Sequence, residues 1–135
     1  MAKEKDIERI AHFIYETGSL KRTPRSGLWF LGSGEQSVAE HTLRAVFISY
    51  VLCCLMPEAN KHRVLFMSLV HDLGEGRTSD LNYIHQRYGR LAEAQAIRDI
   101  AESVPFGKEI REAYEEAHAR ETLEAKLAKD ADNLE

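Results

Sequence analysis

Four residues far apart in the sequence are of the types that hold a divalent metal ion. His41 lies early in a predicted helix, the dipeptide His71-Asp72 follows an apolar run, and Asp132 ends an acidic segment. A mixed set of imidazoles and carboxylates suits Mn²⁺, Fe²⁺, Co²⁺, Ni²⁺ or Zn²⁺ better than Ca²⁺. With some coordination positions left to water, such a set would form a hydrolytic centre, and a phosphate ester is its natural substrate.

Ordinary roles, in a hydrogen bond or a simple ion pair, are the alternative to metal binding for these residues. A single histidine on a helix, such as His41, is usually a surface or hydrogen-bonded residue, and the same interpretation is applied to the remaining histidines, His12, His62, His85 and His118. The pair His71-Asp72 differs because the apolar stretch 64–70 leads into it, and burying such a pair is costly unless it is paired or metal-bound. Spacing alone leaves a metal site and a simple His-Asp ion pair equally open.

The elements that must position these residues are helices. Apolar residues recur at helical spacing from Ile7 to Ile14, along a central segment from Ser37 to Leu55, and from about 60 to 73. Ser37 and Glu40 form a capping-box pattern at the start of the central helix, and Gly74 is expected to end the third. Three further helices are expected near 91–101, 108–119 and 123–134, and the segments 19–36 and 74–82 are expected to be loops.

This pattern predicts an all-α fold, a compact bundle of about six helices with the metal site between its central helices. The helix from Ser37 to Leu55 is apolar nearly all round, so it is expected at the centre of the fold. Residues 1–135 are expected to be a single domain. Because the helical pattern still runs where the sequence ends, the natural protein is expected to continue with at least one more helix.

Composition narrows the classes of partner. The chain is 44% hydrophobic and 30% charged with a net charge of −4, which gives no basic patch for a nucleic acid. The longest apolar stretch, 45–56, is too short to span a bilayer, and the charged start does not resemble a secretory signal. A cytoplasmic protein acting on a small molecule is expected, with no nucleic acid and no membrane as partner.

Three segments together resemble the metal-binding signature of the HD-domain superfamily. They are Ser37-Val38-Ala39-Glu40-His41, His71-Asp72-Leu73-Gly74-Glu75 and Lys129-Asp130-Ala131-Asp132. The order and surroundings are most similar to the branch of small 5'-deoxynucleotidases, which remove phosphate from deoxynucleoside monophosphates. The resemblance implies an HD-domain fold, a homodimer, and one divalent ion (Mn, Co, Ni, Fe, Zn or Mg) held by His41, His71, Asp72 and Asp132.

The same resemblance implies catalytic and substrate-binding roles. Glu75 would orient the attacking water and shuttle its proton, with Asp72 as metal ligand and as a partner of that water. Arg25 would bind the phosphate, and Asp80 would accept a hydrogen bond from the deoxyribose 3'-hydroxyl. The chain departs from the family pattern at Leu28, where a tryptophan is usual; Trp29 follows one position later. The stretch 81–85 also differs, which leaves room for a different substrate.

Two other functions stay open at this point. An HD phosphohydrolase could act on another nucleotide, such as a polyphosphate, cyclic or modified one, because a fold does not determine the substrate. The chain could instead be a non-enzymatic, metal-binding dimerisation module. Glu75 and Asp80 argue against that module, since a purely structural site has no need of further acids at its mouth. Without the resemblance, both residues would be interpreted as solvated loop acids.

Overall fold

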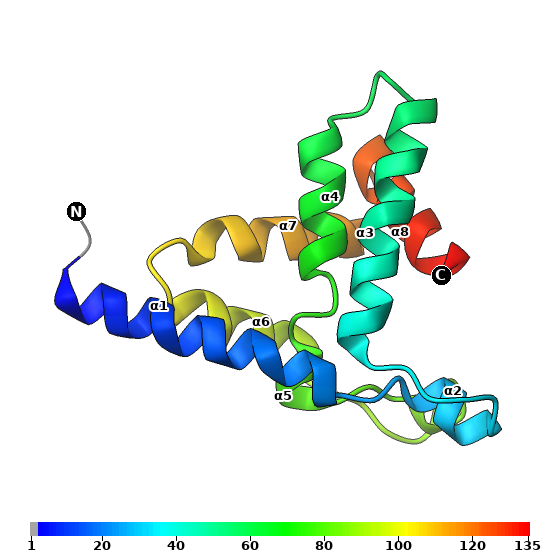
Figure 1. The fold of residues 1–135 in the computed structure, drawn as a ribbon, viewed down its shortest axis with the longest axis horizontal. Coiled ribbons are helices and arrows are strands. Elements are labelled where there is room, and N and C mark those ends of the chain that lie inside the picture. The colour runs from blue at the N-terminus through cyan, green and yellow to red at the C-terminus, as the bar shows by residue number, and fades with distance from the viewer. Residues whose placement is uncertain (1–2) are drawn as a thin grey trace.

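The computed structural model describes residues 3–135, which fold into helices joined by turns (Figure 1). Six helices have ten or more residues: α1 (Glu4–Thr17), α3 (Val38–Leu55), α4 (Lys61–Val70), α6 (Glu93–Glu102), α7 (Gly107–Ala119) and α8 (Leu123–Leu134). Four shorter elements lie between them: η1 (Gly18–Arg22), α2 (Ser26–Leu31), α5 (Glu75–Thr78) and η2 (His85–Arg87). No strand occurs within residues 3–135, so the predicted all-α class is confirmed.

Helices α3 and α4 form an antiparallel pair at the centre of Figure 1, and α8 packs against both of them. Helix α7 crosses α4, and α6 packs against α7 below it. The core that holds these helices together is apolar, and its largest fully buried side chains are Val38, Val64, Met67, Ile97 and Ile100. This packing sets the C-terminal end of α4 between the N-terminal half of α3 and the end of α8.

Helix α3 begins where the capping pattern predicts. The Ser37 hydroxyl accepts a hydrogen bond from the Glu40 backbone N–H at 3.1 Å, which satisfies one of the free donors of the first turn. The Ser37 hydroxyl also lies 3.1 Å from Oε1 of Glu40. The first turn of α3 is thereby fixed, and His41 follows directly after it.

The predicted central position of α3 is wrong in one respect, since only one of its faces is buried. That face carries His41, Ala45, Ser49 and Cys53, which are spaced by four residues and are at most 2% exposed. The other face leaves large apolar side chains in solvent, among them Leu43, Phe47, Val51 and Leu55. An apolar sequence pattern cannot distinguish the two cases, because both faces of such a helix look alike.

Helix α3 is also long and apolar enough to cross a membrane if length and composition are the only criteria. One such helix is weak evidence, because the core helix of a soluble protein passes the same test. One third of the helix is buried within the fold.

Two boundary predictions are wrong. The third predicted helix ends at Val70 rather than near residue 73, and Gly74 precedes the short helix α5 with an ordinary helical φ of −64°. Gly74 is needed for another reason: a Cβ there would lie 3.3 Å from the Glu93 carbonyl oxygen and 3.4 Å from Ile97. In addition, the two predicted loops contain short helices, α2 in the first and α5 in the second.

Candidate metal centre and its pocket

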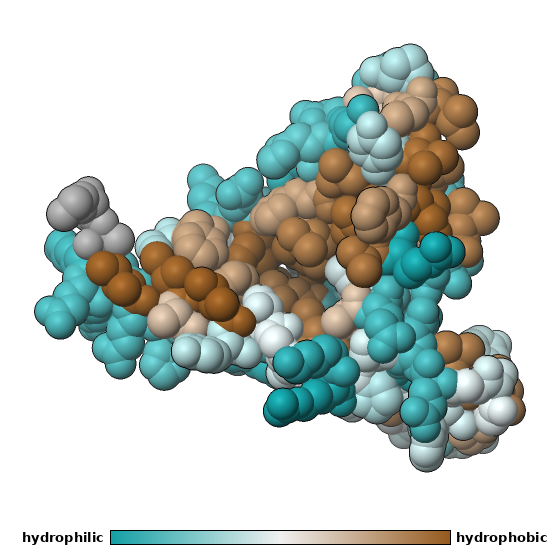
Figure 2. Space-filling view, viewed as in Figure 1, coloured by the Kyte–Doolittle hydropathy of each residue, from teal (hydrophilic) through white to brown (hydrophobic). Residues whose placement is uncertain are grey.

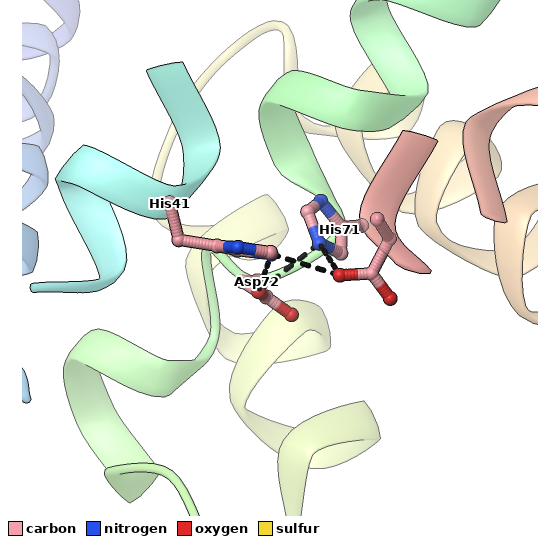
Figure 3. A group of neighbouring side chains, drawn as sticks. His41, His71 and Asp72 are labelled. Atoms are coloured by element: carbon pink, nitrogen blue, oxygen red, sulfur yellow. Dashed lines mark hydrogen bonds and ion pairs between the residues drawn. The ribbon is translucent and has the colours of Figure 1, made fainter. Parts of the chain in front are cut away.

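Two histidines and two aspartates from three parts of the fold meet at one point (Figure 3). His41 comes from α3, His71 and Asp72 from the turn after α4, and Asp132 from α8. Nε2 of His41 lies 2.8 Å from Oδ1 of Asp132 and 3.6 Å from Oδ2 of Asp72. Nε2 of His71 lies 3.0 Å from Oδ2 of Asp72 and 3.4 Å from Oδ1 of Asp132.

The early end of α4 explains how adjacent residues reach one site. Consecutive residues of an α-helix point about 100° apart, so a His-Asp pair inside a helix diverges. Here the helix ends at Val70, and the turn that follows lets His71 and Asp72 converge. The ring of His71 is oriented by its Nδ1, which lies 2.7 Å from the Ser68 carbonyl oxygen. Nδ1–H donates to that carbonyl, which directs Nε2 at the site, where a metal ion would take the place of the proton on that nitrogen.

The four side chains fit a divalent ion. Ligand atoms about 2.1 Å from a metal lie roughly 3.0 to 3.4 Å apart in octahedral or tetrahedral geometry, and the four nitrogen–oxygen separations run from 2.8 to 3.6 Å. Nε2 of His71 is buried and lies near two carboxylates without hydrogen-bond geometry to either. Two imidazoles and two carboxylates are a donor set for a first-row transition metal.

The electrostatics of this ring match a cation site. Burial lowers the pKa of a histidine, but for His71 the carboxylates of Asp132 and Asp72 outweigh it and raise the pKa to about 10. Burial would raise the pKa of Asp132, yet its hydrogen bonds to His41 and Lys129 and the nearby His71 ring hold that pKa well below its usual range. The ring therefore concentrates negative charge that a divalent ion can neutralise.

The ring opens into a pocket of 670 Å³, which is within the ordinary size of small-molecule sites. Its wall is largely polar, and α2, α5, η2 and the facing ends of α7 and α8 contribute to it. Besides His71, Asp72 and Asp132, the lining side chains include Arg25, Glu75, Asp80, Tyr83, Gln86, Glu93, His118, Arg120 and Lys129. A pocket of this kind suits a polar molecule that carries negative charge at its metal-facing end.

Glu75 lies in the wall of this pocket at the start of α5. The residue is only 7% exposed, and its Oε2 is buried without a hydrogen-bond partner. Burial, together with the negative charges of Asp72 and Asp80, raises the pKa of Glu75 to about 9. A carboxyl group with so high a pKa can carry a proton at neutral pH and release it to or accept it from a bound molecule.

Arg25 and Asp80 are positioned by the same short segment. The Arg25 backbone N–H donates to the Gln36 carbonyl oxygen at 2.7 Å, and Nη1 of Arg25 lies 3.9 Å from Oδ2 of Asp72. Oδ2 of Asp80 accepts a hydrogen bond from the Ser26 backbone N–H at 3.1 Å. A guanidinium beside a metal ligand is a place for an oxyanion, and Asp80, hydrogen-bonded to the residue after Arg25, lines the same pocket.

Comparison with protein families supplies the identity of this arrangement. The model of the HD domain matches residues 17–135, which is most of the chain. The chain belongs to the HD-domain family. The resemblance drawn from the three sequence motifs is thus confirmed, as is the dependence on a divalent metal ion that the HD domain brings.

Relatives of this HD-domain chain include enzymes of one named activity. The 5'-deoxynucleotidase hdd1 of Schizosaccharomyces pombe is 29% identical over 93% of this chain and 68% of its own length. The 5'-deoxynucleotidase HDDC2 of Danio rerio is 31% identical over 96% of this chain and 66% of its own length, and that of Dictyostelium discoideum is 31% identical over 91% and 71%. The chain thus spans about two thirds of the length of these relatives.

Solved structures are also similar to this HD-domain chain. A conserved hypothetical protein from Pyrococcus furiosus superposes with a TM-score of 0.83 at 34% identity, covering 92% of this chain and 75% of that one. A predicted metal-dependent phosphohydrolase from Magnetospirillum magnetotacticum superposes with a TM-score of 0.80 at 27% identity, covering 98% and 70%. The predicted HD-domain fold is confirmed.

The structure brings the predicted site residues together around one pocket. All four predicted metal ligands form the HD-domain ring, and Arg25, Glu75 and Asp80 line the same pocket. Trp29 does not line it; this side chain is 67% exposed, and Leu28 lies on the pocket wall instead. The pocket wall therefore carries Leu28 where the family has a tryptophan, and Trp29 does not replace that tryptophan.

Sequence reasoning missed several residues of the pocket wall. His118 was expected to be an ordinary hydrogen-bonded histidine; its Nδ1 lies 3.0 Å from the Tyr114 carbonyl oxygen, yet its side chain also lines the pocket. Glu93 and Arg120 line it as well. A charged residue at the end of a helix carries no signal in the sequence that separates a pocket wall from ordinary surface. Arg120 has a positive φ of 56°, which is visible only in the structure.

Proposed function

We propose that this HD-domain protein is a metal-dependent 5'-deoxynucleotidase that hydrolyses deoxynucleoside 5'-monophosphates to deoxynucleosides and inorganic phosphate. The observation that carries the proposal is the juxtaposition of the four-residue ring with Arg25, Glu75 and Asp80 in one pocket. The relatives named 5'-deoxynucleotidase support the same choice of substrate. A pocket of 670 Å³ also has room for a nucleoside beyond the phosphate.

The phosphate end of the substrate would lie between the ring and Arg25. A divalent ion in the ring supplies positive charge to a phosphoryl oxygen and lowers the pKa of a nearby water. The Arg25 guanidinium, 3.9 Å from Oδ2 of Asp72, donates to the remaining phosphoryl oxygens from the other side. Asp72 therefore has two neighbours to organise, the ion and the attacking water.

Glu75 would act as the general base and then the general acid of the reaction. Its carboxyl group is buried beside Asp72, and its Oε2 has no partner among the described residues. It orients the attacking water through that oxygen, accepts the water proton as the bond to phosphorus forms, and returns a proton to the departing 5'-oxygen. A cation held by His41, His71, Asp72 and Asp132 would favour the ionised form of Glu75 that the first step needs.

Asp80 would select the sugar. Ser26 holds its Oδ2, so the carboxylate has a fixed position on the pocket wall next to the segment that carries Arg25. It accepts a hydrogen bond from the deoxyribose 3'-hydroxyl, and a 2'-hydroxyl would crowd the same region. The proposal thus predicts that dAMP is hydrolysed in preference to AMP.

The test is phosphate release from a nucleotide panel with Mn²⁺, Co²⁺, Ni²⁺ and Mg²⁺ supplied in turn. We expect inorganic phosphate and a deoxynucleoside from the deoxynucleoside monophosphates, and no phosphate release by an Asp72→Ala variant prepared in the same way. Release from nucleoside triphosphates or cyclic nucleotides alone would replace this substrate with another nucleotide. A protein that binds the ion but hydrolyses no member of the panel would be a binding module, and the proposal would be wrong.

We also propose that the protein is a homodimer through the exposed face of α3. Figure 2 shows apolar side chains gathered over α3 and α4, and Leu43, Phe47 and Val51 are between 55% and 64% exposed there. An apolar groove of 540 Å³, lined by Phe13, Leu69 and other apolar residues, continues this face between α1, α3 and α4. Contiguous exposed apolar surface of this kind favours association.

Light scattering coupled to size exclusion tests the dimer. The wild-type chain is expected at about twice its monomer mass of 15.4 kDa, and a Phe47→Glu variant is expected to be monomeric. Tyr15→Glu is the matched control, because Tyr15 is 84% exposed on α1 and lies outside the face. A wild-type monomer at every concentration tested would exclude the dimer.

A further inference from the structure

We propose that Glu135 is a positioning residue for the metal ligand His41, holding the proton of that imidazole on Nδ1. The carboxylate would accept a hydrogen bond from Nδ1–H and leave the lone pair of Nε2 directed at the ion. The inference rests on the metal centre of the proposed function, and it gives a role to a carboxylate that neither the ligand ring nor the pocket chemistry uses.

The first observation is the environment of the His41 ring. The residue is fully buried, and its Nε2 is engaged by the ligand ring. Its Nδ1 is buried without a hydrogen-bond partner, which is costly for a polar ring atom. Oε1 of Glu135 lies 3.7 Å from this nitrogen. A hydrogen bond needs about 2.7–3.2 Å, so a carboxylate shift of roughly half an ångström completes it.

The second observation is how firmly Glu135 is held. Its side chain is only 7% exposed. The Gln36 side-chain amide donates to Oε1, and Nε of Arg44 donates to Oε2 at 3.3 Å. The two donors come from the segment before α3 and from α3 itself. The carboxylate is therefore fixed to the same helix that carries His41.

The third observation is the spacing along α8. Glu135 follows Asp132 by three residues, and residues three apart lie on the same helix face. The C-terminal end of α8 and the cap residue that follows it thus present two carboxylates to opposite nitrogens of one imidazole: Asp132 to Nε2 at 2.8 Å and Glu135 to Nδ1 at 3.7 Å. His71 is treated in a parallel way, since its Nδ1 lies 2.7 Å from the Ser68 carbonyl oxygen.

This arrangement has a chemical consequence for the ion. Only a nitrogen with a free lone pair can bind a metal, so the ring proton of His41 must be on Nδ1 when Nε2 is a ligand. A carboxylate that accepts this proton fixes the tautomer and the ring orientation and makes Nε2 more basic. Losing such a partner typically lowers metal affinity about 10- to 100-fold.

The experiment compares Glu135→Ala, Glu135→Gln and Asp130→Ala by calorimetric titration of Zn²⁺ without substrate. We expect Glu135→Ala to weaken Zn²⁺ binding about 10- to 100-fold, and Glu135→Gln to weaken it less, because the amide oxygen still accepts a hydrogen bond. Asp130→Ala is the matched control, since Asp130 is an exposed carboxylate on the same helix. Nitrogen-15 NMR of the Zn²⁺-loaded wild type should show the His41 proton on Nδ1, with its resonance shifted in Glu135→Ala.

Unchanged Zn²⁺ affinity in a folded Glu135→Ala protein would overturn the inference. If the melting temperature fell while the affinity stayed at the wild-type value, the contact of Glu135 would be merely structural. Should Glu135→Ala fail to fold by circular dichroism, Arg44→Ala replaces it. Arg44 is 67% exposed and supports only one carboxylate oxygen, so a several-fold loss of affinity is expected and no loss contradicts the inference. A wild-type protein that binds no metal would instead refute the proposed function.

Discussion

Nε2 of His41 lies 2.8 Å from Oδ1 of Asp132, although 91 residues separate them in the sequence. This contact joins α3 to α8 at the floor of the pocket, where His41 is completely buried. The same Asp132 oxygen lies 3.4 Å from Nε2 of His71, so it stands between the two imidazoles. Asp132 is thus the one ring residue that comes from the last helix, and it contacts both histidines.

Replacing Asp132 with asparagine should therefore empty the metal site while keeping its shape. The amide removes one negative charge and one strong ligand oxygen, and Lys129 loses its charged partner at 2.7 Å. We expect metal affinity to fall at least about 100-fold, beyond the effect of losing a supporting residue, and phosphate release to fall to background. Metal content after dialysis, with Asp130→Asn as the control, checks this; full metal content in Asp132→Asn would remove Asp132 from the ligand set.

Arg25→Lys tests the phosphate site. Lysine keeps the charge but loses the planar pair of donors that matches two phosphoryl oxygens. We expect kcat/KM for a deoxynucleoside monophosphate to fall by about 10- to 100-fold, which corresponds to roughly 1.4–2.8 kcal/mol of transition-state stabilisation. Metal affinity should be unchanged, because Arg25 is 3.9 Å from Asp72 and is not a ligand.

Arg22→Lys is the matched control for that experiment. Arg22 is an exposed arginine in the preceding element, and it lines a neighbouring surface depression, which Arg25 also borders, but not the metal pocket. Its replacement should leave kcat/KM within a factor of two or so, as expected for a surface substitution. Equal losses in the two variants would indicate a general effect of basic charge near the loop and not a phosphate contact.

The sequence indicated which four residues would come together, and it did so through the resemblance of three segments to the HD-domain signature, because spacing alone left a metal site and an ion pair equally open. His41 follows a capping pattern, and His71-Asp72 ends an apolar run that would not otherwise tolerate charge. The six longer helices were also predicted, since their apolar residues recur at helical spacing. Each of these features can be recognised because the residues that define it lie close together in the sequence.

The remaining features depend on packing between distant segments. Helix α5 is a single turn that places Glu75 beside Asp72, and no periodicity can build up over four residues. The pocket wall formed by Glu93, His118 and Arg120 requires knowing how α6 and α7 approach α8. The exposed face of α3 was misjudged because apolar composition alone does not reveal which face has a partner.

Glu75→Gln should stabilise the metal-free protein at high pH. The folded-state pKa of Glu75 is about 9, above the ordinary glutamate pKa of 4.5, so the folded state binds the proton more tightly. The contribution of this group to stability is full below pH 4.5 and declines as the pH rises through about 9. Glutamine avoids the ionised state, so near pH 8 the variant should gain about 1–3 kcal/mol in free energy of unfolding.

Urea unfolding in a chelator at pH 4 and pH 8 measures this difference between variant and wild type. At pH 4 the difference should vanish, because the wild-type carboxyl is protonated in both states. In the metal-loaded enzyme the same variant should lose about 10²- to 10⁴-fold in kcat, the range for a general acid–base group. A difference in free energy of unfolding between variant and wild type that is the same at pH 4 and pH 8 would show that Glu75 ionises normally in the folded protein.

Gly107→Ala should be among the most damaging substitutions outside the site. Gly107 begins α7, and a Cβ there would lie only 1.7 Å from the Ala101 carbonyl oxygen. Backbone atoms cannot rotate away as a side chain can, so α6 and α7 must separate, which costs at least about 3 kcal/mol. Gly18→Ala is the control: a Cβ there meets nothing within 4 Å and φ is −63°, so a change between zero and about 1 kcal/mol of stabilisation is expected. The free energies of unfolding of the two variants are compared by chemical denaturation followed by circular dichroism. Similar values would mean that the α6–α7 junction is looser than the close approach at Gly107 indicates.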